Sequence, residues 1–100
     1  MRKANYKLTK IKELAVLRSV KPPYNRELND MEKLGYSLDD ALKIIVKLRE
    51  SNFFESRHEK EPPADVYKYV DNDITIYIKI GILKVQHKLL LEIISFHEDR

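Results

Sequence analysis

Cysteine and tryptophan are absent from this chain of 100 residues, and glycine occurs only twice. Without cysteine the protein forms no disulfide and offers no thiolate to a metal ion. The three histidines, His58, His87 and His97, are well separated and include no i,i+4 pair. The sequence therefore predicts neither a zinc site nor any other metal centre, and no cofactor is expected.

Long apolar runs are also missing. No segment approaches the ~20 apolar residues that a membrane-spanning helix needs. The basic residues at the N-terminus are not followed by the apolar core of a signal peptide. We therefore expect a cytoplasmic protein with no membrane partner.

The composition favours one globular domain. Hydrophobic residues make up 43% of the chain and charged residues 35%, which is typical of a folded protein. A chain of this length leaves no room for a second core, so we predict a single domain over residues 1–100, with residues 1–7 as a flexible lead-in. The formal net charge of +3 suits a polyanionic partner but is not diagnostic, because many small domains are mildly basic.

Three helices are predicted in the first half of the chain. The first has Thr9 as its N-cap and ends before Pro22, because residues that precede proline disfavour helical geometry. The second spans about residues 26–34 and ends at Gly35, a residue suited to the position after a helix. The third begins at Ser37, with acidic residues in its first turn and basic residues in its last. The apolar faces of the three helices are predicted to consist of Ile11, Leu14, Ala15, Leu28, Met31, Leu34, Leu38, Ala41, Leu42, Ile45 and Leu48.

Isoleucine occupies every even position from Ile74 to Ile82. Successive residues of a strand point to opposite faces, so one face of this predicted strand is apolar. The other face carries a hydroxyl, a phenol and an ammonium group, from Thr75, Tyr77 and Lys79. Further strands are predicted over residues 65–70 and 89–99.

This order of elements predicts an α+β fold. Three N-terminal helices are expected to pack on one face of a small C-terminal antiparallel sheet. Residues 51–63 are predicted to form a charge-rich connecting loop, in which Phe53 and Phe54 pack into the core under the third helix.

Short motifs in the second half of the chain carry a family resemblance. They are LRESNFFES at residues 48–56, DVY at 65–67, IYIK at 76–79 and ISFHE at 94–98. Together with Leu34-Gly35 before the third helix, they resemble the MqsR (motility quorum-sensing regulator) toxin family from Thr9 to the C-terminus. The resemblance implies a RelE-like fold, cleavage of messenger RNA without a metal ion, and neutralisation by a cognate antitoxin.

The resemblance also assigns individual positions. Tyr77 occupies the position of the family's active-site tyrosine, and His97 stands where the best-known members carry the lysine of Ser-Phe-Lys-Glu. Two positions depart from the family pattern. Glu55 replaces the lysine of Phe-Tyr-Lys-Ser, and Ala64 replaces the glutamine before Asp-Val-Tyr, so neither inherits a catalytic role.

Tyr77 and His97 are therefore the candidate catalytic residues. Metal-independent RNA cleavage needs a base for the 2′-hydroxyl, an acid for the 5′ oxygen and cations on the phosphate. Histidine suits the first two roles because its ordinary pKa, about 6.5, lies near neutrality. Without the resemblance, a histidine near a chain end is usually solvated and a strand tyrosine usually just covers the sheet.

Four basic residues are candidates for binding RNA. Lys79 shares a strand face with Tyr77 and lies about 7 Å further along the strand. Arg57, His58 and Lys60 follow the aromatic pair and offer the charge lost at Glu55, although neighbouring glutamates partly cancel it. The alternative for all four is a solvated basic side chain.

Two other functions remain open at this point. One is a non-catalytic RNA- or protein-binding module that keeps the fold after losing the lysine and the glutamine. The other is a small subunit held by a second protein through an exposed strand edge. Cleavage of RNA in the presence of EDTA would separate the enzyme from a binding module, and a neighbouring gene for a DNA-binding antitoxin would favour a toxin.

Overall fold

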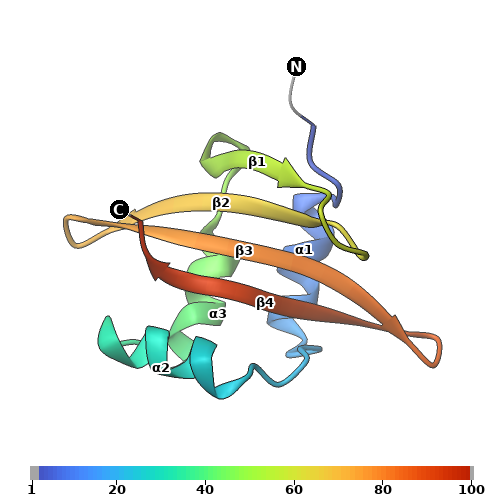
Figure 1. The fold of residues 1–100 in the computed structure, drawn as a ribbon, viewed down its shortest axis with the longest axis horizontal. Helices are drawn as coiled ribbons and strands as arrows, with labels where there is room; N and C mark the ends of the chain where they lie inside the picture. The colour runs from blue at the N-terminus through green and yellow to red at the C-terminus, as the bar shows by residue number, and fades with distance from the viewer. Residues whose placement is uncertain (1–2, 100) are drawn as a thin grey trace.

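The computed structural model describes residues 3–99, which form three α-helices followed by a four-stranded antiparallel sheet (Figure 1). The helices are α1 (Leu8–Val16), α2 (Asn25–Lys33) and α3 (Leu38–Lys47), and a short 3-10 turn, η1 (Glu50–Asn52), leads into the sheet. The strands are β1 (Phe53–Arg57), β2 (Ala64–Asp71), β3 (Ile74–Val85) and β4 (Lys88–Glu98), in the spatial order β1-β2-β3-β4. The predicted α+β fold class is confirmed.

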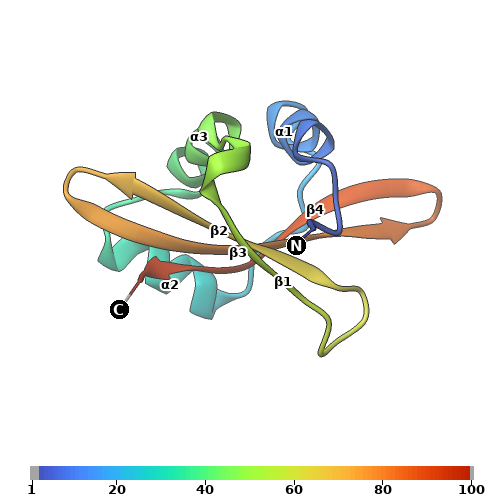
Figure 2. The same cartoon turned by 90° about the horizontal axis from the view of Figure 1, so that it is seen from above.

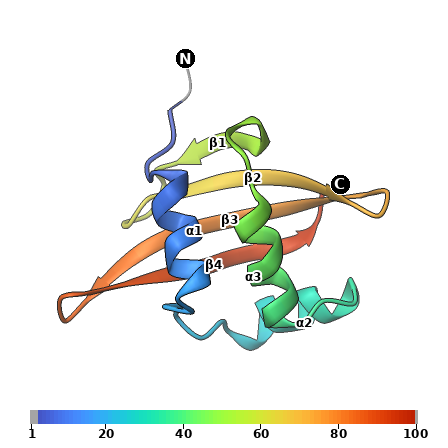
Figure 3. The same ribbon diagram turned by 180° about the vertical axis from the view of Figure 1, so that it is seen from behind.

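Most of the core lies between the sheet and two of the helices. α1 and α3 lie side by side on one face of the sheet (Figures 2 and 3). Ile76, Ile78 and Ile80 of β3 are fully buried in this core, so the isoleucine alternation marks the face that the helices cover. Fully burying one such side chain contributes about 1.5–3 kcal/mol to folding. The other fully buried apolar side chains of the core cluster are Ile11, Met31, Ala41, Ile45, Leu48, Tyr67, Leu91 and Phe96.

α2 occupies a different place, along the edge strand β4 (Figure 1). Met31 is buried as predicted, but Leu28 is 37% exposed. Glu27 is buried instead, with 3% of its surface exposed. Glu27 and Met31 are four residues apart and so share one helix face, whereas Leu28 lies at the exposed flank of that face.

The helix ends follow the predicted chemistry at two of three positions. Ser37 and Asp40 form a reciprocal capping box at the start of α3, with backbone-to-side-chain distances of 3.0 and 3.2 Å. Gly35, after α2, has the positive φ of 85° that suits glycine. The prediction of Thr9 as the first N-cap is wrong: α1 begins at Leu8, with Lys7 at the cap and no side-chain cap bond. Leu8 is buried in the core and is the first residue of the helix, so the helix begins one residue before the predicted cap.

β1 occupies residues that were predicted to be a loop. A β-bulge between Phe53 and Glu55 interrupts the alternation of inward and outward side chains. The strand therefore lacks the period of two by which a strand is identified in a sequence. Phe53 packs edge-on against Tyr67, with ring centroids 5.6 Å apart, so its predicted core packing is confirmed. The same prediction is wrong for Phe54, which is 37% exposed and has the Lys68 ammonium 3.7 Å from its ring centroid.

Two tight turns fix the register of the long strands. Asn72 and Asp73 connect β2 to β3, and Gln86 and His87 connect β3 to β4, all with positive φ. Such two-residue turns match the twist of a β-hairpin. The resulting register places Tyr77 opposite His97.

The segment before α1 is anchored to the sheet through Asp65, which is fully buried. The backbone and side-chain amides of Asn5 each donate to one carboxylate oxygen at 2.9 Å, and the backbone amide of Tyr6 donates to the other at 3.0 Å. These bonds satisfy a carboxylate whose burial would otherwise be costly. Asn5 and Tyr6 belong to the expected lead-in, whereas Met1 and Arg2 lie outside the described residues. None of the helices within residues 3–99 has the length and apolar character to cross a membrane.

Candidate functional site

The sheet face opposite α1 and α3, here called the open face, carries two cross-strand rows of side chains. Directly opposed residues of antiparallel strands share a face and interact. The alternation of β3 therefore places Tyr77 and Lys79 on the open face, because Ile76, Ile78 and Ile80 point into the core. One row consists of Lys68, Tyr77 and His97, and the next consists of Glu55, Val66, Lys79 and Ser95.

Tyr77 and His97 are in direct contact. Their rings are stacked with centroids 5.0 Å apart and an interplanar angle of 10°. Nδ1 of His97 lies 3.0 Å from the carbonyl oxygen of Glu98. A carbonyl only accepts, so Nδ1 is the donor in this contact, and the neutral form of this exposed ring then has Nε2 as its acceptor. The pair thus combines a proton acceptor with a neighbouring hydroxyl group.

A groove of about 570 Å³ surrounds this pair. Asp30, Lys33 and Leu34, from the C-terminal end of α2 and the residue after it, form one wall. The other wall consists of Tyr77 from β3, His97 from β4 and Asp99, which follows β4. We call this the Tyr77–His97 groove. The position of α2 along β4 therefore makes the groove, and the ammonium of Lys33 is largely exposed at its rim.

Lys68 is a member of this row that the sequence reasoning missed. Its Nζ lies 3.1 Å from Oδ2 of Asp99 and over the ring of Phe54. The alternation of residues 65–70 contains the necessary signal, because Lys68 follows the buried Tyr67 and must point to the opposite face.

Arg57 is held by two carboxylates. Nη1 lies 2.8 Å from Oε2 of Glu55, and Nε lies 2.7 Å from Oε1 of Glu59. The hydrogen bonds that Arg57 donates to Glu59 and Glu55 raise the pKa of the guanidinium, and the bond to Glu59 lowers the pKa of that carboxyl to about 2. The guanidinium that was expected to replace the missing lysine is thus paired with the glutamate that stands in its place.

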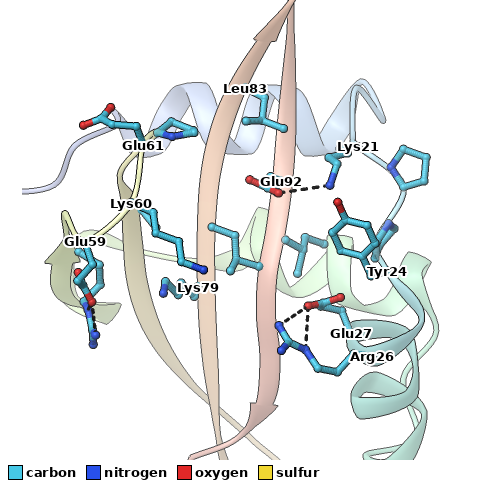
Figure 4. A pocket seen from close by; sticks show the side chains of 17 residues that line it. Lys21, Tyr24, Arg26, Glu27, Glu59, Lys60, Glu61, Lys79, Leu83 and Glu92 are labelled. Carbon is cyan, nitrogen blue, oxygen red and sulfur yellow. Dashed lines mark hydrogen bonds and ion pairs between the residues drawn. The ribbon is translucent and has the colours of Figure 1, made fainter.

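The other three basic candidates are placed differently. Within residues 3–99, Lys60 and Lys79 make no hydrogen bond or ion pair, and both line a second pocket on the open face, together with Arg57 (Figure 4). His58 is exposed on the β1–β2 connection and does not line that pocket. The structure therefore brings Tyr77 and His97 together in one place and Lys60, Lys79 and Arg57 in another. Across residues 3–99, no three histidine, aspartate or glutamate side chains come together as a metal site.

The chain matches a protein-family model. A family model described as "Motility quorum-sensing regulator, toxin of MqsA" matches residues 3–98, nearly the whole chain. A search of curated proteins gives no match. Both Tyr77 and His97 fall within the matched range.

Proposed function

The chain belongs to the MqsR toxin family, and we propose that it is the toxin of a toxin–antitoxin pair that cleaves messenger RNA without a metal ion. Its partners are then RNA and a cognate antitoxin, and its place of action is the cytoplasm. One observation carries the proposal. Tyr77 and His97 stack on the open sheet face with an imidazole nitrogen left to accept a proton.

The proposed reaction uses the 2′-hydroxyl of the RNA as the nucleophile. Nε2 of His97 takes the proton of that hydroxyl, and the 2′ oxygen attacks the adjacent phosphorus. The bond from phosphorus to the 5′ oxygen breaks, and the leaving oxygen takes a proton from water on the exposed face. The products are a 2′,3′-cyclic phosphate and a 5′-hydroxyl end. The Tyr77 hydroxyl stabilises the charge that develops on the phosphoryl oxygens. The Lys79 ammonium, about 7 Å further along the strand, binds a neighbouring phosphate of the RNA.

Cleavage in the presence of EDTA tests this proposal. The wild-type protein should cut a single-stranded RNA with EDTA present and leave 5′-hydroxyl ends. Tyr77→Phe keeps the stacked ring and deletes only the hydroxyl, so it should lose activity without a change in Tm. RNA that stays intact with the wild-type protein, or that is cut only after Mg²⁺ is added, would contradict the proposed chemistry.

A non-catalytic RNA-binding module is the second candidate. The observation that favours it is the Glu55–Arg57 ion pair, which places a carboxylate and a neutralised guanidinium where the family carries a lysine. In that case the wild-type protein binds RNA in a titration and leaves it intact under the same conditions.

A further inference from the structure

Glu27 is a buried carboxylate with one unpartnered oxygen. Oε1 accepts hydrogen bonds from Nη2 of Arg26 at 2.9 Å and from Nε at 3.3 Å. Oε2 is buried and has no hydrogen-bond partner within residues 3–99. Only 4% of the Glu27 side chain is exposed, whereas that of Arg26 is 77% exposed. Buried polar atoms are rarely left unpaired, so this oxygen indicates a position prepared for a hydrogen-bond donor.

Glu27 lines the second pocket on the open face, here called the Glu27 pocket, which has a volume of about 390 Å³. Figure 4 shows its two sides: Lys60 extends from the β1–β2 connection, and Glu27 and Tyr24 lie opposite, at the start of α2. Leu83 and Ile94 add apolar surface from β3 and β4. The pocket thus offers an apolar floor, an aromatic ring, two ammonium groups without partners in residues 3–99 and one unused acceptor.

Some charged side chains of the pocket are paired within the protein and others are not. Lys21 lies 3.4 Å from Glu92 and 4.0 Å from the centroid of the Tyr24 ring, so its ammonium is engaged within the protein. Lys60 and Lys79 have no such partners in the described chain and are suited to a phosphate. A ligand that is anionic at one end and donates an N–H at the other matches both features. A nucleotide has this character.

We propose that the Glu27 pocket binds one nucleobase of the RNA strand, and that Glu27 selects a base that carries an amino group. The inference rests on the proposed function and specifies its substrate. Oε2 is covered in the free protein, so the Glu27 carboxylate turns towards the base when RNA binds. Because a carboxylate oxygen only accepts, Oε2 then takes a hydrogen bond from the amino group of cytosine, adenine or guanine. Uracil presents a carbonyl where cytosine presents its amino group, and its own N–H lies at N3, so a base held with its exocyclic group at Glu27 leaves Oε2 unpaired when that base is uracil.

The strand β3 connects this pocket to the Tyr77–His97 groove. Lys79 lines the pocket and lies two residues from Tyr77 on the same face, about 7 Å along the strand. An RNA strand with its scissile phosphate at the stacked pair therefore passes Lys79, and a neighbouring nucleotide reaches Glu27. The face of the Tyr24 ring that Lys21 does not cover provides a surface against which that base can stack.

The test measures the binding of two RNAs that differ at the selected group. Hexamers of 2′-O-methyl cytidine and of 2′-O-methyl uridine lack the hydroxyl needed for cleavage and can be titrated against the wild-type protein. The cytidine hexamer should bind at least about tenfold more tightly, the lower end of the effect of one hydrogen bond to a charged group. Glu27→Gln keeps the shape but can donate as well as accept, so it should bring the ratio of the two affinities close to one.

Glu32→Gln is the matched control. Glu32 is exposed on the same helix, and its substitution removes the same charge without touching the pocket. Loss of a negative charge strengthens binding of both RNAs alike, so the ratio of affinities isolates the base contact. The control should keep the wild-type ratio, and unchanged Tm values would show that both variants are folded.

Equal affinity of the wild-type protein for the two hexamers would overturn the inference, as would an unchanged preference in Glu27→Gln. Either result leaves the proposed function standing as long as RNA is still cut in EDTA. Failure to bind either hexamer and to cleave RNA would instead remove the proposed function and this inference together. Binding of trilysine that Glu27→Gln abolishes, with no cytidine preference, would assign the pocket to a cationic peptide and also overturn the inference.

Discussion

His97 stands where the best-known members of the MqsR family carry a lysine, and the two side chains differ in what they can do at neutral pH. An ammonium is protonated there and only donates, whereas a neutral imidazole accepts at one nitrogen. The Glu98 carbonyl holds Nδ1, and the Tyr77 ring holds the plane of the imidazole. The exchange therefore replaces an ammonium with an imidazole that is held in a defined orientation.

Replacement of this histidine should reduce cleavage sharply. His97→Ala removes the proposed base and is expected to lower the cleavage rate by ~10²–10⁴-fold, the usual contribution of a general base. The pH–rate profile of the wild-type protein should have a limb near neutrality that the variant lacks. His58→Ala is the control, because His58 is exposed on the β1–β2 connection and lies outside the groove. Full activity in His97→Ala with the limb intact would move the chemistry to another residue.

Replacement of Glu55 by lysine is expected to strengthen RNA binding. Its carboxylate repels phosphate and holds Arg57 at 2.8 Å, so Glu55→Lys restores the family's cation and also releases Arg57 from that ion pair. Titration with a single-stranded RNA at fixed salt should show tighter binding and a steeper dependence on salt concentration. Glu13→Lys, on the exposed outer side of α1, makes the same charge change away from the open face. Equal gains in the two variants would show that net charge, and not the position of Glu55, is responsible.

At the scale of elements, the sequence predicts a helix or strand most accurately where a single pattern of residues, such as a cap or an alternation, determines it. The capping residues of α3 and the isoleucine alternation of β3 locate these elements because each pattern agrees with the local geometry. β1 was missed because its bulge interrupts the alternation and its residues are mostly polar. The unpartnered carboxylate of Glu27 could not be foreseen, because a glutamate in a polar helix is ordinarily solvated and only the packing of α2 along β4 buries it.

Tyr36 ties the connection between α2 and α3 to the end of β2. Its hydroxyl donates a hydrogen bond to Oδ2 of Asp71, and its ring packs edge-on against Phe96 at 5.8 Å. Burial, followed by the hydrogen bond to Asp71, raises the pKa of Tyr36 from 10.0 to about 12. The folded protein therefore keeps the phenolic proton at pH values where the unfolded chain loses it.

This shift predicts how stability depends on pH. Below pH 10 both states hold the proton and the hydrogen bond contributes fully, about 1 kcal/mol, or about 4–8 °C in Tm for a domain of this size. As the pH rises from 10 to about 12, the unfolded state releases its proton first and the contribution is lost. Tyr36→Phe keeps the ring, so the difference in Tm between wild type and variant should be present at pH 8 and shrink above pH 10. A difference that does not change across this range would show that the phenol is not linked to folding.

At the scale of the whole molecule, the two edges of the sheet test the hypothesis that a second protein holds this chain by pairing with an exposed strand. β1 is a short edge strand of five residues. The opposite edge is partly covered, because the backbone of Leu91 in β4 exchanges hydrogen bonds of 2.8 Å with Ser19 and Lys21. Short or covered edges are poor templates for an added strand. The described part of the chain therefore favours recognition through the open face over recognition through a strand edge.

Expression of the intact chain tests its role as a toxin. A protein that cuts messenger RNA stops growth of the cell that makes it, so induction of the wild-type chain alone is expected to arrest growth. Co-expression of an adjacent gene product should restore growth, because a cognate antitoxin with an acidic surface would suit the net charge of +3. His97→Ala, expressed to the same soluble level, should be tolerated without the partner and so separates cleavage from a general burden of expression. Normal growth at high soluble levels of the wild-type chain would count against a toxin, while equal toxicity of His97→Ala would indicate that harm arises from binding and not from RNA cleavage.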